Sequence, residues 1–108
     1  MPRRASASAL TRAIGQRLRM FRKEKGLRLA HVGAHGAGKG HISNLESGLV
    51  NPTVTLLDRI AQNMGIELPY LVCLPDASER QALIERTRHL SDDEVKMLLA
   101  LLGPARQA

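Results

Sequence analysis

The stretch Ile42-Ser43-Asn44-Leu45-Glu46-Ser47-Gly48, followed by Asn51-Pro52-Thr53, contains the residues that decide the fold. Ile42 and Leu45 are three positions apart, so a helix would bury both on one face. Ser43 and Asn44 then lie on another face. Gly48 permits a sharp exit from the helix, including a positive φ angle, and the Asn51-Pro52 step favours extended backbone before the next helix. The stretch therefore predicts a short two-faced helix, a turn and a second helix.

Apolar residues recur at helical spacing on both sides of this stretch. Leu10, Ile14, Leu18 and Phe21 form one such stripe. Ser91 and Glu94 form a capping-box pattern that marks the start of the last helix. No segment alternates with a period of two residues over a useful length, so the chain is predicted to be all-α. The predicted helices are residues 8–25, 29–35, 41–47, 53–64, 69–73 and 78–89, with the last one ending at Leu102.

The composition is that of one small globular protein. The chain has 108 residues, and 44% of them are apolar, which is enough for a core. Only 2% are aromatic, which argues against a surface that stacks nucleic-acid bases. The one cysteine, Cys73, fits a reducing compartment and a small core residue. No apolar run approaches the length of about 18 residues that a membrane span needs, and residues 1–10 lack the apolar segment of a secretory signal. We therefore expect a cytoplasmic protein with no membrane association.

The positive charge is concentrated in the first half of the chain. The whole chain has a formal charge of +6, from 16 Lys and Arg against 10 Asp and Glu. Residues 1–51 contain ten of these basic residues and only two acidic ones, whereas residues 52–108 contain six basic and eight acidic ones. A basic half joined to a mildly acidic half indicates a face that binds a polyanion, although a solvated basic surface would give the same count.

Residues 15–66 resemble the helix-turn-helix domain of the Cro and phage-repressor (XRE-like) family. The resemblance covers about half of the chain and implies an all-α fold. We expect a five-helix lambda-repressor-like helix-turn-helix domain in residues 8–74, followed by a C-terminal helical pair in residues 76–103. The matching segments are 14–27, 42–48, 51–53, 56–61 and 64–66.

The resemblance implies that the third helix reads the major groove of double-stranded DNA while the second helix crosses the backbone. Asn44 is then placed to pair with adenine and Lys39 to donate to guanine. The candidates for the groove are Lys39, His41, Ser43 and Asn44, and those for phosphate are Arg17, Arg28, Ser47, Asn51 and, as a weaker candidate, Arg22. Each is equally a candidate for a solvated surface side chain.

Arg22 and Glu46 match an ion pair between the first and third helices of this family, which implies a structural role for both residues. The alternative is a loose surface pair that contributes little stability.

The second helix and the following turn depart from the family pattern. Arg28 and Leu29 stand where the family usually has a Ser or Thr cap and a Gln. Residues 33–40 contain four glycines, each of which costs a helix up to about 1 kcal/mol relative to alanine. We therefore expect this segment to be loosely ordered without DNA; strong amide-exchange protection across residues 30–40 of the free protein would contradict this.

Two other patterns in the same segment point to different chemistry. Residues 33–39 match the spacing of a phosphate-binding loop, but Gly40 stands where that loop needs a Ser or Thr to hold Mg²⁺. His31 and His35 are four residues apart, as metal ligands on a helix would be, yet no carboxylate or cysteine nearby completes the set. No nucleophile with a base is apparent. We therefore predict no metal, no cofactor and no enzymatic activity.

The expected function is a sequence-specific transcriptional regulator, a repressor from a bacterium or phage, that binds a palindromic operator. Because such proteins usually bind as two-fold dimers, residues 76–103 are interpreted as a homodimerisation element. The alternatives are that these helices cap the core of their own subunit or dock a partner protein. In the last case the chain is an adaptor or antitoxin-like interaction module that keeps the fold without binding an operator. The dimer contacts are assigned to Leu98, Leu99 and Leu102, with Tyr70 and Leu71 as additional candidates.

Overall fold

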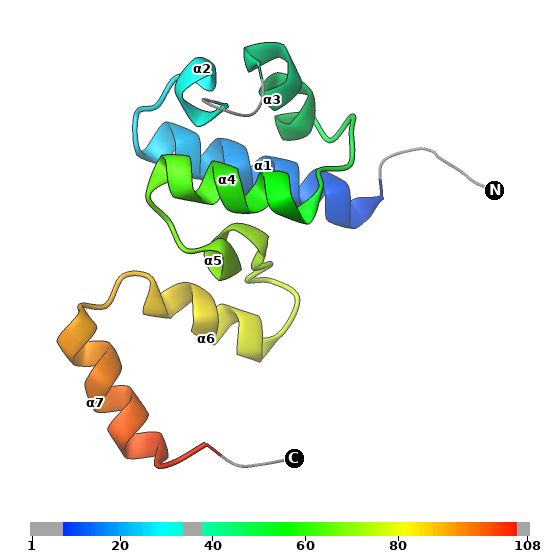
Figure 1. The fold of residues 1–108 in the computed structure, drawn as a ribbon. Helices are drawn as coiled ribbons and strands as arrows, with labels where there is room; N and C mark the ends of the chain where they lie inside the picture. The colour runs from blue at the N-terminus through cyan, green and yellow to red at the C-terminus, as the bar shows by residue number, and fades with distance from the viewer. Residues whose placement is uncertain (1–7, 34–37, 106–108) are drawn as a thin grey trace. The chain divides into compact units, whose positions relative to one another are not determined.

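The computed structural model describes residues 8–33 and 38–105, and these residues form helices with no strands (Figure 1). The all-α prediction is therefore confirmed. The chain divides into two units between Leu74 and Pro75. The first unit contains α1 (Ala9–Glu24), α2 (Leu29–Val32), α3 (Lys39–Glu46), α4 (Val54–Met64) and α5 (Leu68–Val72), and the second contains α6 (Glu79–Thr87) and α7 (Asp92–Leu102).

The core of the first unit lies where the predicted apolar stripes meet. α1 packs against α3 and α5, α4 packs against α2 and α5, and α2 packs against α3. Leu10 is an exception to the predicted α1 stripe, because it lies in the first turn of the helix and is 54% exposed. The largest fully buried side chains are those of Leu18, Phe21, Val32, Ile42, Ile60 and Leu71.

Hydroxyl side chains cap two helices of this unit. The Ser8 hydroxyl accepts a hydrogen bond from the Thr11 N–H at the start of α1. The Thr53 hydroxyl accepts one from the Leu56 N–H at the start of α4. Each bond satisfies a backbone donor that the helix itself leaves without an acceptor.

The second and third helices differ from their predicted bounds. α2 is only four residues long, and residues 34–37, with His35 and much of the glycine-rich segment, lie outside the described residues. α3 begins at Lys39, two residues before the predicted start, with Gly38 as its N-cap. Glycine is well tolerated at an N-cap, so the low helix propensity of Gly38 does not delay the start of the helix.

The second unit has no buried core of its own. Both of its helices begin with a serine cap, and the predicted capping box of Ser91 and Glu94 is formed in both directions, at 3.1 Å and 2.9 Å. No residue of α6 or α7 is buried when the chain is considered alone. None of the described helices has the length and apolar character needed to cross a membrane.

Candidate nucleic-acid interface

α3 has one face inside the first unit and one face outside it. Ile42, Leu45 and Glu46 are buried against the rest of the unit. The side chains of Lys39, His41, Ser43 and Asn44 are exposed. In Figure 1, α3 lies beside α2 at one end of the unit, above α1 and α4. The helix therefore presents four polar or basic side chains outward from a position that its apolar face fixes.

Gly15 allows α3 to approach α1 more closely than any other residue would. A Cβ atom at this position would lie 2.3 Å from the carbonyl oxygen of Leu45 and 2.9 Å from that of Glu46. Both neighbours are backbone atoms near the end of α3, so neither can rotate away. The missing side chain therefore sets the distance between the two helices.

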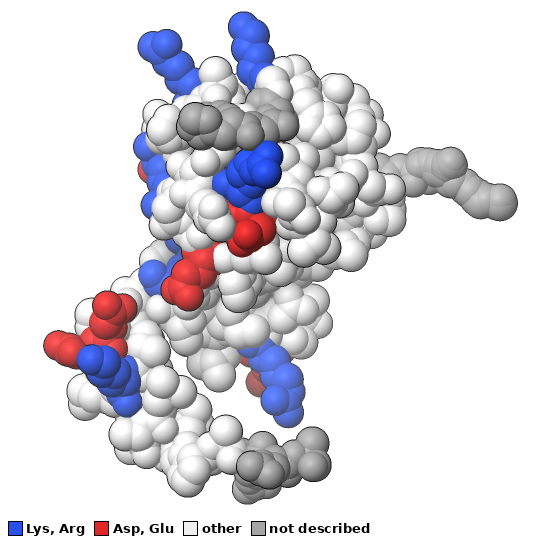
Figure 2. Space-filling model, in the orientation of Figure 1, with Lys and Arg blue, Asp and Glu red and all other residues white. Residues whose placement is uncertain are grey.

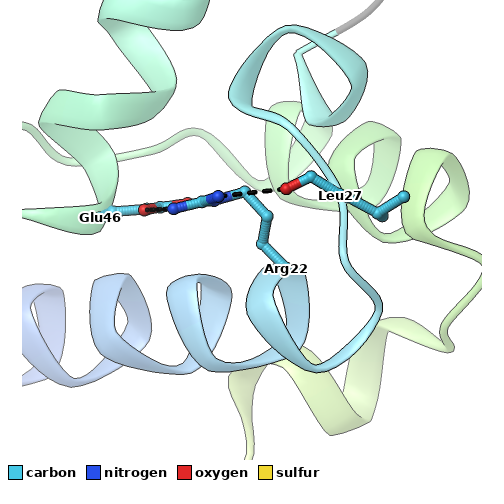
Figure 3. A network of polar contacts seen from close by, with 3 residues as sticks. All are labelled: Arg22, Leu27 and Glu46. Carbon is cyan, nitrogen blue, oxygen red and sulfur yellow. Dashed lines mark hydrogen bonds and ion pairs between the residues drawn. The ribbon is translucent and has the colours of Figure 1, made fainter.

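Arg22 and Glu46 join α1 to α3 through two parallel hydrogen bonds (Figure 3). Arg22 Nε lies 2.6 Å from Glu46 Oε2, and Arg22 Nη2 lies 3.0 Å from Glu46 Oε1. The side chains are only 16% and 6% exposed. The hydrogen bond to Glu46 raises the pKa of Arg22 above its already high ordinary value, although burial opposes the shift. The structure thus places the predicted pair together in a shielded, two-pronged arrangement.

The third contact of Arg22 ties the same side chain to the segment before α2. Its Nη1 donates to the carbonyl oxygen of Leu27 at 3.1 Å. Each of the three guanidinium nitrogens therefore donates to a protein oxygen. This arrangement argues against Arg22 as a phosphate ligand.

The chain leaves α3 through Gly48, which has a φ angle of +74°. This left-handed conformation is the sharp exit that the sequence predicts, and it is available to glycine at little cost. A Cβ atom on Gly48 would lie 2.8 Å from Arg12 Cγ, so the first turn of α1 packs directly on this exit. The same turn contacts Asn51, whose Oδ1 accepts a hydrogen bond from Thr11 Oγ1 at 2.5 Å. The segment after α3 is therefore held against α1 at two neighbouring points.

Seven of the eight predicted DNA-binding residues are exposed. Arg28 is the N-cap residue of α2. The remaining six belong to α3 or to the segment that follows it: Lys39, His41, Ser43, Asn44, Ser47 and Asn51.

Arg17 is the member of the predicted set that the structure places elsewhere. It is 7% exposed, its Nη2 donates to the carbonyl oxygen of Tyr70 at 2.6 Å, and its guanidinium carbon lies 4.9 Å from the centre of the Phe21 ring. The hydrogen bond ties α1 to α5, and the cation–π interaction lies within α1 and helps to hold the guanidinium in place. Arg17 therefore stabilises the fold instead of contacting phosphate.

The basic charge lies on the unit that contains α3. Residues 8–33 and 38–74 include nine Lys and Arg against four Asp and Glu, whereas residues 75–105 include four against six. Figure 2 shows blue side chains projecting from the end of the first unit where Figure 1 places α2 and α3. A polyanion that approaches this end meets an attractive potential.

The alternative chemistries gain no support from the described residues. No group of three or more His, Cys, Asp and Glu side chains is gathered there to hold a metal ion. His31 is exposed, and its proposed partner His35 lies outside the described residues, as do four residues of the segment with phosphate-loop spacing. Cys73 is buried, as expected for a small core residue.

Comparisons with known proteins agree with this geometry. A family model described as helix-turn-helix matches residues 18–71, half of the chain. The HTH-type transcriptional regulator SinR of Bacillus licheniformis is 31% identical over 68 residues, which are 61% of this chain and 61% of SinR. The chain thus spans about three fifths of the length of the curated relative it matches. No solved structure gives a significant match.

Proposed function

Because the chain belongs to the XRE-type helix-turn-helix family of DNA-binding transcriptional regulators, we propose that it is a repressor that binds a palindromic operator as a homodimer. The observation that supports this most directly is the outward face of α3. Its four polar side chains project from a helix that Gly15, Arg22 and Glu46 hold rigidly on the basic end of the first unit.

The proposed contacts follow from the chemistry of each side chain. The Asn44 amide pairs with the N6 and N7 edge of adenine, and Lys39 donates to the O6 and N7 acceptors of guanine. His41 and Ser43 are also exposed on α3, and we assign them to the same reading surface. Arg28, Ser47 and Asn51 donate to phosphates on either side of the groove and set the register of α3 without reading sequence.

We assign dimerisation to the second unit. Apolar side chains line a groove of about 380 Å³ between α6 and α7. Leu99 is 61% exposed and Leu102 is 80% exposed, and each belongs to a unit without a buried core. A palindrome requires two copies of α3 related by a two-fold axis, and a self-complementary apolar face supplies that symmetry. The groove is lined by Leu83, Thr87, Val95, Leu98, Leu99, Leu101 and Leu102.

Two residues that the sequence offered as dimer contacts do not fit this role. Leu71 is fully buried in the core of the first unit, and Tyr70 packs against the same core. We therefore assign the dimer contacts to the exposed apolar side chains that line the groove between α6 and α7.

The proposed function is tested by selecting duplexes from a random pool and measuring their affinity at different salt concentrations. We expect a palindromic consensus with half-sites about one helical turn apart. If six or more phosphates are contacted, the affinity falls by about 10³-fold between 50 and 200 mM salt. An interaction module that keeps the fold without operator binding would give no consensus at any salt concentration.

The dimer is tested by replacing one groove leucine with a charged residue. Leu99→Glu is expected to convert a dimer into a monomer in sedimentation experiments, because a carboxylate in an apolar interface loses its hydration. Met97→Glu is the matched control, since Met97 lies on the same helix and is 67% exposed but does not line the groove. The control should remain dimeric. A wild-type protein that is monomeric at micromolar concentration would contradict the assignment and favour a different partner for the groove.

A further inference from the structure

Three polar residues connect the start of α1 to the segment after α3. Ser8 Oγ lies 3.0 Å from Thr11 Oγ1, and Thr11 Oγ1 donates to Asn51 Oδ1 at 2.5 Å. Ser8 Oγ also accepts from the Thr11 backbone N–H at 3.0 Å. Thr11 is only 8% exposed, whereas Asn51 is exposed. The buried Thr11 hydroxyl thus holds the amide oxygen of Asn51, a residue that is itself exposed to solvent.

The direction of these hydrogen bonds fixes the orientation of the amide. A carbonyl oxygen only accepts hydrogen bonds, so Thr11 uses its one hydroxyl proton on Asn51 Oδ1. The Thr11 oxygen is then left to accept from the Ser8 hydroxyl, which adds to the same chain of bonds. With Oδ1 bonded to Thr11, the NH₂ group of the exposed Asn51 is left for other partners, and no hydrogen bond joins it to another residue in the described part of the chain.

We infer that Thr11 is a positioning residue for DNA binding, because it holds the Asn51 amide with its NH₂ group, and not its oxygen, toward the phosphate backbone. The inference rests on the proposed function and adds to it a residue that does not itself touch DNA. An amide that is free to rotate by 180° also presents its oxygen, which a phosphate oxygen repels. The Thr11 hydroxyl removes that second orientation.

The neighbouring backbone supports the same conclusion. Arg12 packs on Gly48 one residue away from the Thr11–Asn51 hydrogen bond. The first turn of α1 therefore fixes both the path of the segment after α3 and the orientation of its amide. This combination holds a neutral donor on the segment that directly follows α3.

The test compares Thr11→Val, Thr11→Ser, Asn51→Ala and the double variant Thr11→Val/Asn51→Ala. Binding is measured on a 30-base-pair duplex of arbitrary sequence at low salt, because phosphate contacts do not depend on sequence. Thr11→Val is expected to weaken binding about 3- to 10-fold, the range for one hydrogen bond. Thr11→Ser should bind like the wild type. The double variant should bind no more weakly than Asn51→Ala, since Thr11 acts through Asn51.

Two further variants separate positioning from a general loss of structure. Thr55→Val makes the same chemical change at an exposed threonine of α4 and should leave binding unchanged. Asn51→Asp keeps the acceptor for Thr11 but presents an oxygen outward, and it should bind more weakly than Asn51→Ala. Because the lost contact is uncharged, the dependence of affinity on salt should stay the same in Thr11→Val.

Three outcomes would overturn the inference. The first is that Thr11→Val binds like the wild type. The second is that the losses in the two single variants multiply in the double variant, because Thr11 would then act independently of Asn51. The third is that Asn51→Ala binds like the wild type. In all three cases the wild type still binds DNA, so the proposed function stands; a wild type that binds no duplex at low salt would overturn both.

Discussion

Gly15→Ala is expected to destabilise the first unit by about 3 kcal/mol. The new Cβ would lie 2.3 Å from the Leu45 carbonyl oxygen, and the only way to relieve the overlap is to move α3 away from α1. That movement opens the packing of Ile42 and Leu45 and stretches the hydrogen bonds between Arg22 and Glu46. Alanine is more favourable than glycine inside a helix by about 1 kcal/mol. The measured loss of stability is therefore the cost of the clash minus this gain in helix propensity.

Gly40→Ala provides the matched control for this prediction. Gly40 is also inside a helix, but a Cβ atom there meets nothing within 4 Å. The same substitution should therefore stabilise the protein, by up to about 1 kcal/mol. Urea unfolding of both variants and the wild type, with the slopes compared, gives the two free energies. A Gly15→Ala protein as stable as Gly40→Ala would show that α1 and α3 do not approach each other so closely.

The sequence was sufficient to predict the features that depend on neighbouring residues. The apolar spacing of Ile42 and Leu45 identified the inner face of α3, and Gly48 marked the exit with positive φ. The capping pattern of Ser91 and Glu94 identified the start of α7. In each case the relevant interaction lies within one or two helical turns, so local spacing contains the information.

Features that depend on distant contacts were predicted less well. Arg17 and the exposed arginines of the first half look alike in sequence. The burial of Arg17 depends on packing against distant residues such as Tyr70, 53 positions away. The bond between Thr11 and Asn51 spans 40 residues and leaves no local pattern. Residue identity does not distinguish a surface arginine from a buried one, because its long apolar stem suits both environments.

The Arg22–Glu46 pair is a long-range contact that was expected, and it was expected only because of the family resemblance. Charge spacing alone does not select Glu46 as the partner of Arg22, since the two residues are 24 positions apart. The structure adds the two-pronged geometry, the burial and the contact with Leu27. These three details determine how much the Arg22–Glu46 pair contributes to the free energy of unfolding.

Glu46→Ala is expected to reduce the free energy of unfolding by about 3–5 kcal/mol. The variant removes both carboxylate acceptors of Arg22, whose side chain is only 16% exposed in the wild type, and the cost of shielding that charge from water is then uncompensated. Because α3 loses its ion pair with α1, DNA affinity should fall together with the free energy of unfolding. This is expected even though Glu46 is buried and is not among the residues proposed to contact DNA. Glu67→Ala, which removes an exposed carboxylate from the same unit, should change stability by less than about 0.5 kcal/mol.

The double variant Arg22→Met/Glu46→Leu separates the contribution of the ion pair to stability from the cost of leaving the Arg22 charge without a partner. Apolar replacements of both partners often restore the stability that a single removal loses. Recovery should be incomplete here by about 1 kcal/mol, because the Leu27 carbonyl also loses its donor. The raised pKa of Arg22 means that its contribution is complete below the ordinary arginine range and is lost only as pH rises through the raised value. The lower free energy of unfolding of Glu46→Ala at neutral pH should therefore arise from the missing carboxylate. A double variant no more stable than Glu46→Ala would show that the loss came from packing and not from the uncompensated charge.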